Sequence, residues 1–205
     1  MIRRAAIAFL AVLLAACAGA KQQQQQQASA ASPAASGAYR VLLNTSRGPV
    51  VIEVDPALAP NGAKHFEELV RAHFYDGARF YRVVPGFVVQ WGIAADPKIS
   101  KKWDQPIPDD PVKTSNVRGT VTFAATSEPN SRTTDLFVNL ADNANLDGMG
   151  FAPLGRVVSG MQNVDKIYPG YGEQPDQGEM TARGNAYLLK QFPKLDYIKT
   201  ARIQP

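Results

Sequence analysis

The sequence predicts a mainly β domain that folds into a closed or nearly closed barrel. Short apolar runs recur along residues 39–205, and several of them alternate between apolar and polar positions as half-buried strands do. Only a few segments carry helical spacing, and many strands with few helices are typical of a barrel with a helix at each open end. The segment is also long enough to bury one core without disulfides.

The strand-like runs are separated by turn residues. In chain order they cover 39–44, 49–55, 79–84, 87–91, 119–125, 136–140, 151–159 and 197–203. The first two form a hairpin around Ser46-Arg47-Gly48. The third and fourth meet at Pro85-Gly86, a pair that favours a type II turn because glycine supplies the positive φ. Long polar loops are expected at 94–117 and 126–135.

Helical spacing occurs in three segments. The first begins near Asn61, a candidate N-cap, and ends at Asp76-Gly77. The second opens at Ser159, with Gln162 placed three residues later as in a capping box. The third is a short helix over residues 186–191, with Asn185 as a candidate N-cap and Pro193 beyond its end. It lies within an extended segment near the C-terminus that we expect to brace the barrel or to offer a surface for a partner or substrate.

Two histidines lie within the first predicted helical segment. His65 and His73 are eight residues apart, with no Cys or acidic ligand set close by in the sequence. We therefore expect solvent-facing histidines rather than a metal site.

The most informative stretch is residues 80–90, Phe-Tyr-Arg-Val-Val-Pro-Gly-Phe-Val-Val-Gln. It places Arg82 inside an apolar strand-like run. Because burying a guanidinium is costly unless it has a partner, an arginine at this position calls for an explanation. One is a surface arginine whose head group stays in water; the other is a functional donor.

The N-terminus predicts export. Arg3 and Arg4 precede an apolar stretch over residues 5–14 that is too short to span a bilayer, and Leu14-Ala15-Ala16-Cys17 resembles the lipobox of bacterial lipoproteins. We expect a signal peptide over residues 1–16, a lipid anchor on Cys17, and a flexible Ala/Gln/Ser-rich tether over 17–38. The alternative is an ordinary secretory signal with an incidental cysteine.

This anchor predicts a location in the cell envelope. We expect the protein to face the periplasm of a Gram-negative bacterium from the outer membrane, since Ala18 rather than Asp follows the cysteine. Without Arg3 and Arg4, the chain has 20 basic and 18 acidic side chains, a net charge of +2. No cluster of Lys and Arg with interleaved aromatics is present, so nucleic acid is not an expected partner.

The motifs together resemble the cyclophilin-type peptidyl-prolyl isomerases over residues 39–205. The matching stretches are residues 80–90, Thr122-Phe123-Ala124, Leu136-Phe137-Val138, Leu146-Asp147-Gly148 and residues 153–161. The resemblance implies a closed eight-stranded antiparallel barrel capped by two α-helices, with a peptide groove on its outer face. It also implies proline-containing polypeptides as partners, and no cofactor or metal. We expect a monomer.

Residue roles follow from the same resemblance. Arg82 and Gln90 match the catalytic arginine and the glutamine that orients it. A guanidinium suits this role because it stays charged and presents donors in a fixed fork. The substrate-binding positions are Phe87, Val88, Ala124, Ala125, Asp135, Phe137, Leu146 and Phe151. For the apolar residues among them, simple core packing is the alternative.

Three departures from the usual pattern bear on activity. Tyr81 stands where His is frequent, and Ala125 where Asn is usual, and both changes are expected to be mild. Asp135 stands where Gln is usual and adds a negative charge that pairs with Arg82 or selects basic substrates. The expected function is isomerisation of X-Pro bonds during folding of envelope proteins; the alternative is a catalytically weak proline-peptide-binding or holdase module tethered to the membrane.

Overall fold

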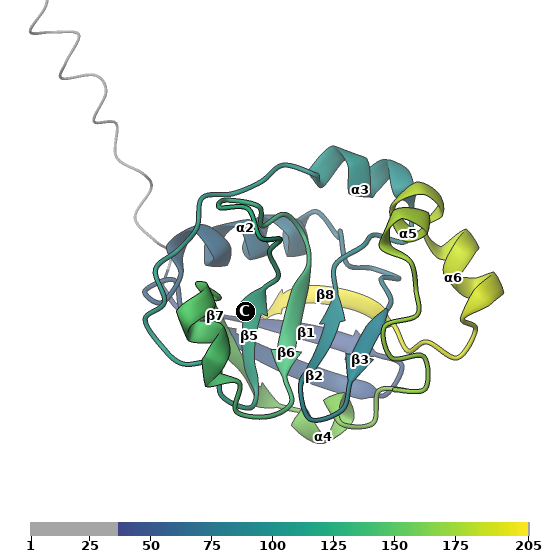
Figure 1. The fold of residues 1–205 in the computed structure, drawn as a ribbon. Helices are drawn as coiled ribbons and strands as arrows, with labels where there is room; N and C mark the ends of the chain where they lie inside the picture. Colours follow the sequence, from purple (N-terminus) through teal and green to yellow (C-terminus); the bar gives the residue numbers. More distant parts are fainter. Residues whose placement is uncertain (1–36, 205) are drawn as a thin grey trace, which may run out of the picture. The chain divides into compact units, whose positions relative to one another are not determined.

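The computed structural model describes residues 37–204, which form one antiparallel sheet with short helices around it (Figure 1). The strands are β1 (Tyr39–Thr45), β2 (Gly48–Val54), β3 (Arg82–Val84), β4 (Val88–Trp91), β5 (Thr120–Phe123), β6 (Leu136–Asn139), β7 (Pro153–Ser159) and β8 (Ile198–Gln204). Their order in the sheet is β3-β4-β6-β5-β7-β2-β1-β8. The predicted signal peptide, Cys17 and nearly all of the tether lie outside the described residues.

The sheet curls into a half-barrel that stays open between β3 and β8, so the prediction of a closed barrel is wrong. Beyond the named strands, the two edges are joined by an isolated bridge between Arg79 and Tyr197 and by backbone hydrogen bonds of 2.8–3.0 Å between residues 77–80 and 196–198. The physical reason for the opening lies in β3, which has three residues. Its Val83 N–H donates to the carbonyl of Gly172 at 3.1 Å, so a C-terminal loop and not β8 lies along this part of the edge.

One apolar core fills the inside of the curled sheet. It includes Ile52, Phe66, Trp91 and Leu154, all essentially inaccessible. Helix α2 (Pro60–Arg71) packs against β7 and β8 near one end of the half-barrel, and the one-turn helix α4 (Met161–Val164) lies at the other end against β2 (Figure 1). Within residues 37–204, no helix is long and apolar enough to cross a membrane.

The predicted N-caps of the first two helices are wrong, for separate reasons. Helix α2 starts at Pro60, and its free backbone N–H groups at Asn61 and Gly62 donate to the carboxylate of Asp110 at 3.1 and 2.8 Å. A side chain from a distant loop therefore caps this helix. Helix α4 is preceded by Gly160 at φ 86°, because Ser159 still belongs to β7. A Cβ at position 160 would lie 2.2 Å from the carbonyl oxygen of Pro49.

Four helical segments lie outside the barrel ends. Helix α3 (Pro97–Trp103) and the 3₁₀ segment η1 (Ala144–Met149) form in loops where the sequence showed no helical spacing. Helices α5 (Gln177–Arg183) and α6 (Asn185–Gln191) belong to the C-terminal insert, residues 168–194, and α6 confirms the predicted short helix. Its predicted N-cap, Asn185, is wrong, because Gly184 holds the cap position and Asn185 is already helical. Figure 1 shows α5 and α6 beside β3, with α3 next to α5.

His65 is buried, which contradicts its predicted solvent-facing position, whereas His73 is exposed. The Nε2 atom of His65 lies 2.7 Å from the carbonyl of Thr133, and the ring packs near Trp103 and Phe123. Burial lowers the pKa of His65 below its usual range. Within the described part of the chain, no three His, Cys, Asp or Glu side chains are placed to hold a metal ion.

Candidate active site

The β3–β4 hairpin places Arg82 and Gln90 directly opposite each other. Phe87 N–H donates to the Val84 carbonyl at 2.9 Å, and Gly86 has φ 75°, as the Pro85-Gly86 turn predicted. Side chains alternate along a strand, so Val83 and Val89 enter the core while Arg82 and Gln90 lie together on the opposite, outer face. The pairing therefore explains why a strand can carry an arginine without burying it in the core.

An apolar cluster adjoins this pair, separate from the main core. Val88, Phe137 and Leu146 are its buried members, and Phe87, Ala124 and Phe151 pack against them partly exposed. The rings of Phe137 and Phe151 meet edge to face with centroids 5.8 Å apart. Six of the predicted substrate-binding residues thus converge from β4, β6 and η1 and from the residues next to β4, β5 and η1. Ala125 is half-buried next to Ala124 but is not part of the cluster.

A network of buried asparagine side chains supports the backbone of the apolar cluster. The Asn116 side chain donates to the carbonyl of Phe151 at 2.7 Å and to Asp147 at 2.8 Å, and it accepts from Thr122 at 3.0 Å. Asn143 donates to the carbonyl of Phe87 at 3.0 Å. Hydrogen bonds from Ser115 and Asn116 hold the pKa of Asp147 below its usual range. These asparagines therefore position two aromatic residues of the cluster, a role that the sequence did not reveal.

The Arg82 guanidinium lies at the rim of the cluster. Its carbon sits 5.5 Å from the centroid of the Phe87 ring, and Nη1 donates to Gln90 Oε1 at 3.3 Å. Nε donates to Glu173 of the insert at 2.5 Å. No partner for Nη2 occurs in the part of the chain that the structure describes. The arginine is held from two sides and keeps one donor group for an approaching molecule.

Asp135 does not pair with Arg82. It accepts a hydrogen bond from the Tyr81 hydroxyl at 2.7 Å, and that hydroxyl accepts one from Gln90 Nε2 at 2.7 Å. Dense packing around the carboxylate raises the pKa of Asp135 to about 6, and the Tyr81 hydrogen bond opposes this rise. Asp135 is thus connected to Arg82 only through Tyr81 and Gln90.

This arrangement combines a permanently charged donor with an apolar surface at its side. Such a pair suits a ligand that is apolar and carries a hydrogen-bond acceptor next to its apolar part, as a prolyl peptide does. The chemistry available is donation of a hydrogen bond, since no nucleophile or titrating acid faces the cluster among the residues described above.

Comparison with known proteins agrees with this geometry. A family model described as Cyclophilin type peptidyl-prolyl cis-trans isomerase/CLD matches residues 40–183, most of the chain. The chain belongs to the cyclophilin-type peptidyl-prolyl cis-trans isomerases. The match spans the whole hairpin, the apolar cluster and the first part of the insert.

Relatives of this cyclophilin include several bacterial enzymes. Peptidyl-prolyl cis-trans isomerase A of Dickeya dadantii is 40% identical over 139 residues, which cover 65% of this chain and 73% of that protein. Peptidyl-prolyl cis-trans isomerase B of Escherichia coli is 34% identical over 166 residues, 77% of this chain and 94% of that protein.

Solved structures share the fold of this cyclophilin. A cyclophilin type isomerase of Cryptosporidium parvum, solved in the presence of the dipeptide Ala-Pro, superposes with a TM-score of 0.61 at 19% identity, covering 81% of this chain and 99% of that one. The cyclophilin AquaCyp293 of Hirschia baltica covers 80% of this chain and 73% of its own at 20% identity, with a TM-score of 0.59.

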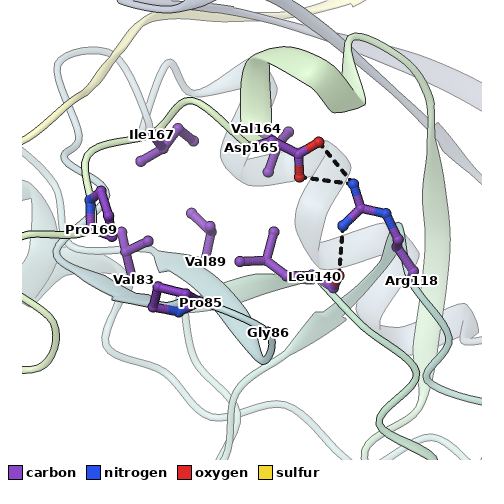
Figure 2. Close-up of a pocket in the computed structure, with 10 residues that line it drawn as sticks. All are labelled: Val83, Pro85, Gly86, Val89, Arg118, Leu140, Val164, Asp165, Ile167 and Pro169. Carbon is purple, nitrogen blue, oxygen red and sulfur yellow. Dashed lines mark hydrogen bonds and ion pairs between the residues drawn. The ribbon is translucent and has the colours of Figure 1, made fainter.

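A hollow of about 250 Å³ lies on the other side of the hairpin, near α4 (Figure 2). Val83 and Val89 line it, and Arg118 flanks it with a two-pronged ion pair to Asp165, both contacts at 2.8 Å. None of the predicted site residues contributes to its lining. A second hollow, of about 260 Å³, lies beside Arg82 between Tyr81, Glu173, Pro175 and Gln177.

Two groups beside the Arg82–Gln90 pair could not be found from the sequence. Glu173 lies 91 residues from Arg82 in a segment without a recognisable motif. Tyr81 is more than the mild substitution that the sequence predicts, because its hydroxyl joins Asp135 to Gln90. For Glu173, the available signal was a charged side chain in a turn-rich insert. For Tyr81, the signal was that it and Asp135 both depart from the residues usual in the family.

Proposed function

We propose that this chain accelerates cis/trans isomerisation of X-Pro peptide bonds, with Arg82 as the catalytic donor and Gln90 as the residue that orients it. The observation that carries the proposal is the Arg82 guanidinium, held by Gln90 at the rim of an apolar cluster to which Phe87, Phe137 and Leu146 belong. The family supports the reaction class, and the geometry supports the residue roles.

The reaction itself explains why these residues suffice. Rotation about an X-Pro bond crosses a barrier of about 18–20 kcal/mol, because amide resonance is lost on the way. In the twisted transition state the proline nitrogen regains its lone pair. A donor aimed at that lone pair stabilises the transition state more than either planar isomer. The apolar cluster would hold the proline ring so that the nitrogen lies close to the Arg82 donors.

The experiment for this proposal is a protease-free isomerisation assay with the full-length chain and a blocked Ala-Pro peptide. We expect turnover that saturates with peptide concentration and needs no added metal or cofactor. A full-length chain that binds the peptide but leaves its isomerisation rate at the uncatalysed value would refute the proposal.

The contact between Arg82 and Glu173 favours a second candidate, a proline-peptide-binding module with weak catalysis. In that case Glu173 would hold the guanidinium away from the substrate. The Glu173 side chain is 61% exposed, and exposed ion pairs contribute only about 0–1 kcal/mol because solvent and salt screen them. A bound peptide can therefore displace Glu173, and we favour the enzyme.

Replacing Glu173 by glutamine separates these two functions. For an enzyme whose substrate displaces an exposed carboxylate, Glu173→Gln changes kcat/KM by less than about fivefold, as expected from an exposed ion pair of this strength. Glu128→Gln, in the exposed stretch 126–130, is the matched control. An increase of a hundredfold or more on Glu173→Gln would show that this carboxylate suppresses catalysis in the native chain.

We also propose that the enzyme is a lipid-anchored monomer of the cell envelope, facing the periplasm from the outer membrane and acting on folding envelope proteins. The lipobox-like sequence around Cys17 supports the anchor. A diacyl thioether, usually with a further acyl chain, would provide the two or more chains that stable anchoring requires.

Replacing Cys17 by serine is expected to move the protein from the membrane to the soluble envelope fraction of a Gram-negative host, since the thiol to be lipidated is lost. The measurement is cell fractionation together with incorporation of a labelled fatty acid. Because residue 17 lies far from the catalytic domain in sequence, isomerase activity should persist. A Cys17→Ser protein that stays in the membrane fraction would contradict the anchor.

A further inference from the structure

A chain of hydrogen bonds runs from Asp135 through Tyr81 and Gln90 to Arg82. We infer that Tyr81 and Asp135 are positioning residues, which set the direction that the Gln90 amide faces and so make the support of Arg82 depend on the protonation of Asp135. This inference rests on the proposed function, because it gives a regulatory group to the same catalytic pair.

The direction of each hydrogen bond follows from what each group can do. An ionised carboxylate only accepts, so the single hydroxyl proton of Tyr81 goes to Asp135. The Tyr81 oxygen then accepts from Gln90 and receives the amide NH₂ group. The carbonyl end of Gln90 is thereby turned to Arg82 Nη1, which needs an acceptor. While Asp135 is ionised, this is the one consistent set of donors and acceptors, because the carboxylate has no proton to donate.

A proton on Asp135 opens the reverse arrangement. The carboxylic acid can donate to the Tyr81 oxygen, and Tyr81 is then free to donate to Gln90. An amide that accepts from Tyr81 presents its NH₂ group to Arg82. Two donors would then face each other, and the hydrogen bond between Gln90 and Arg82 is lost. In this scheme the protonation change is on Asp135, and what changes at Arg82 is its hydrogen-bond support from Gln90.

The surroundings of Asp135 allow such a titration. Tyr81 precedes β3, Tyr75 follows α2 and Asp104 follows α3, and these are the titratable groups that act on the Asp135 carboxylate. Within residues 37–204, no Lys, Arg or His lies within 4.0 Å of it to form an ion pair. With desolvation dominant and Asp104 adding repulsion, the pKa of Asp135 is raised to about 6. The pKa of Tyr81 lies well above 10, so its hydroxyl stays protonated throughout.

The C-terminal insert holds the middle of this chain in place. Tyr81 is buried in a small apolar cluster of its own with Met180 and Leu188 of the insert, together with Ile93 and Leu195. On the other side, Gly92, directly after β4, lets the backbone approach Asp135 closely, since a Cβ at position 92 would lie 2.6 Å from Asp135 Oδ1. Fixed packing around Tyr81 leaves its hydroxyl proton as the freely reorienting part.

The experiment measures kcat and KM of the full-length chain between pH 5 and pH 8, with a blocked Ala-Pro peptide that has no titrating group. In the wild type we expect kcat to fall by up to about tenfold as the pH drops through 6, the loss of one hydrogen bond to a charged group, with KM nearly constant. In Asp135→Asn, kcat should not change with pH, whatever its absolute value, because the carboxamide does not titrate. Tyr81→Phe should lower kcat at pH 8 and also remove the pH step.

A second measurement does not depend on turnover. The side-chain amide signals of Gln90 in a ¹H–¹⁵N spectrum should shift with a midpoint near pH 6 in the wild type and stay constant in Asp135→Asn. His65, which is unchanged in that variant, serves as the internal control for other titrations. An active wild type with a flat profile and constant Gln90 signals would overturn the inference while leaving the isomerase assignment intact. An inactive wild type with titrating Gln90 signals would refute only the proposed function.

Discussion

Replacing Arg82 by alanine is expected to lower kcat for prolyl isomerisation by about two to three orders of magnitude. Removal of a preorganised donor that acts on the transition state costs about 3–4 kcal/mol, and each 1.4 kcal/mol corresponds to a factor of ten. KM should change little, because the apolar cluster around Phe137 still binds the proline ring. Steady-state kinetics of the purified full-length variant with a blocked Ala-Pro peptide checks both numbers.

Arg156→Ala is the matched control, because this arginine is 70% exposed and lies on β7, away from the cluster. Its kcat should equal that of the wild type. Thermal unfolding of both variants excludes a folding defect. Turnover in Arg82→Ala that matches the control would show that the donor for the twisted amide is another group.

The second large effect concerns stability. Asn116→Ala is expected to lower the free energy of unfolding by about 3 kcal/mol, because buried partners would be left without hydrogen bonds at about 1–3 kcal/mol each. Those partners include Thr122, the carbonyl of Phe151 and Asn139. Urea-induced unfolding monitored by tryptophan fluorescence measures the loss. KM should rise as well, because Phe151 loses its support.

Asn145→Ala provides the comparison, since Asn145 is an exposed residue of η1. Surface substitutions of this kind usually change the free energy of unfolding by less than about 0.5 kcal/mol. If Asn116→Ala were as stable as Asn145→Ala, the buried amide network would not be what holds η1 and Phe151 in position.

The predicted strands matched the structure closely where local pattern and turn chemistry agreed. Alternation at Val50, Ile52 and Val54 and the Pro85-Gly86 turn determine two hairpins from short-range information alone. The closure of the barrel could not be predicted in this way. At the open edge the Val83 N–H donates to Gly172, which lies 89 residues further along the chain and has no local sequence signal.

The candidate site shows the same division. The convergence of the apolar positions could be predicted, because the matching family motifs contain residues of one shared surface. Arg82 and Gln90 lie opposite each other, as the hairpin turn requires. Of the two roles expected for Asp135, pairing with Arg82 is not found, because Asp135 accepts instead from the Tyr81 hydroxyl, a contact that the sequence does not reveal. The other role, selection of basic substrates, stays a prediction. Similarly, the N-cap predictions for α2 and α4 were wrong, because Asp110 and Gly160 take these positions through tertiary contacts.

Exchange NMR spectroscopy on a proline peptide tests the central claim most directly. The cis and trans signals of a blocked Ala-Pro peptide are recorded with a catalytic amount of the full-length chain. Uncatalysed interconversion takes tens of seconds or more. We predict exchange cross-peaks between the two isomers within a second in the presence of the wild type, and none with Arg82→Ala. Binding shifts without exchange in the wild type would contradict the account and identify the chain as a binding module.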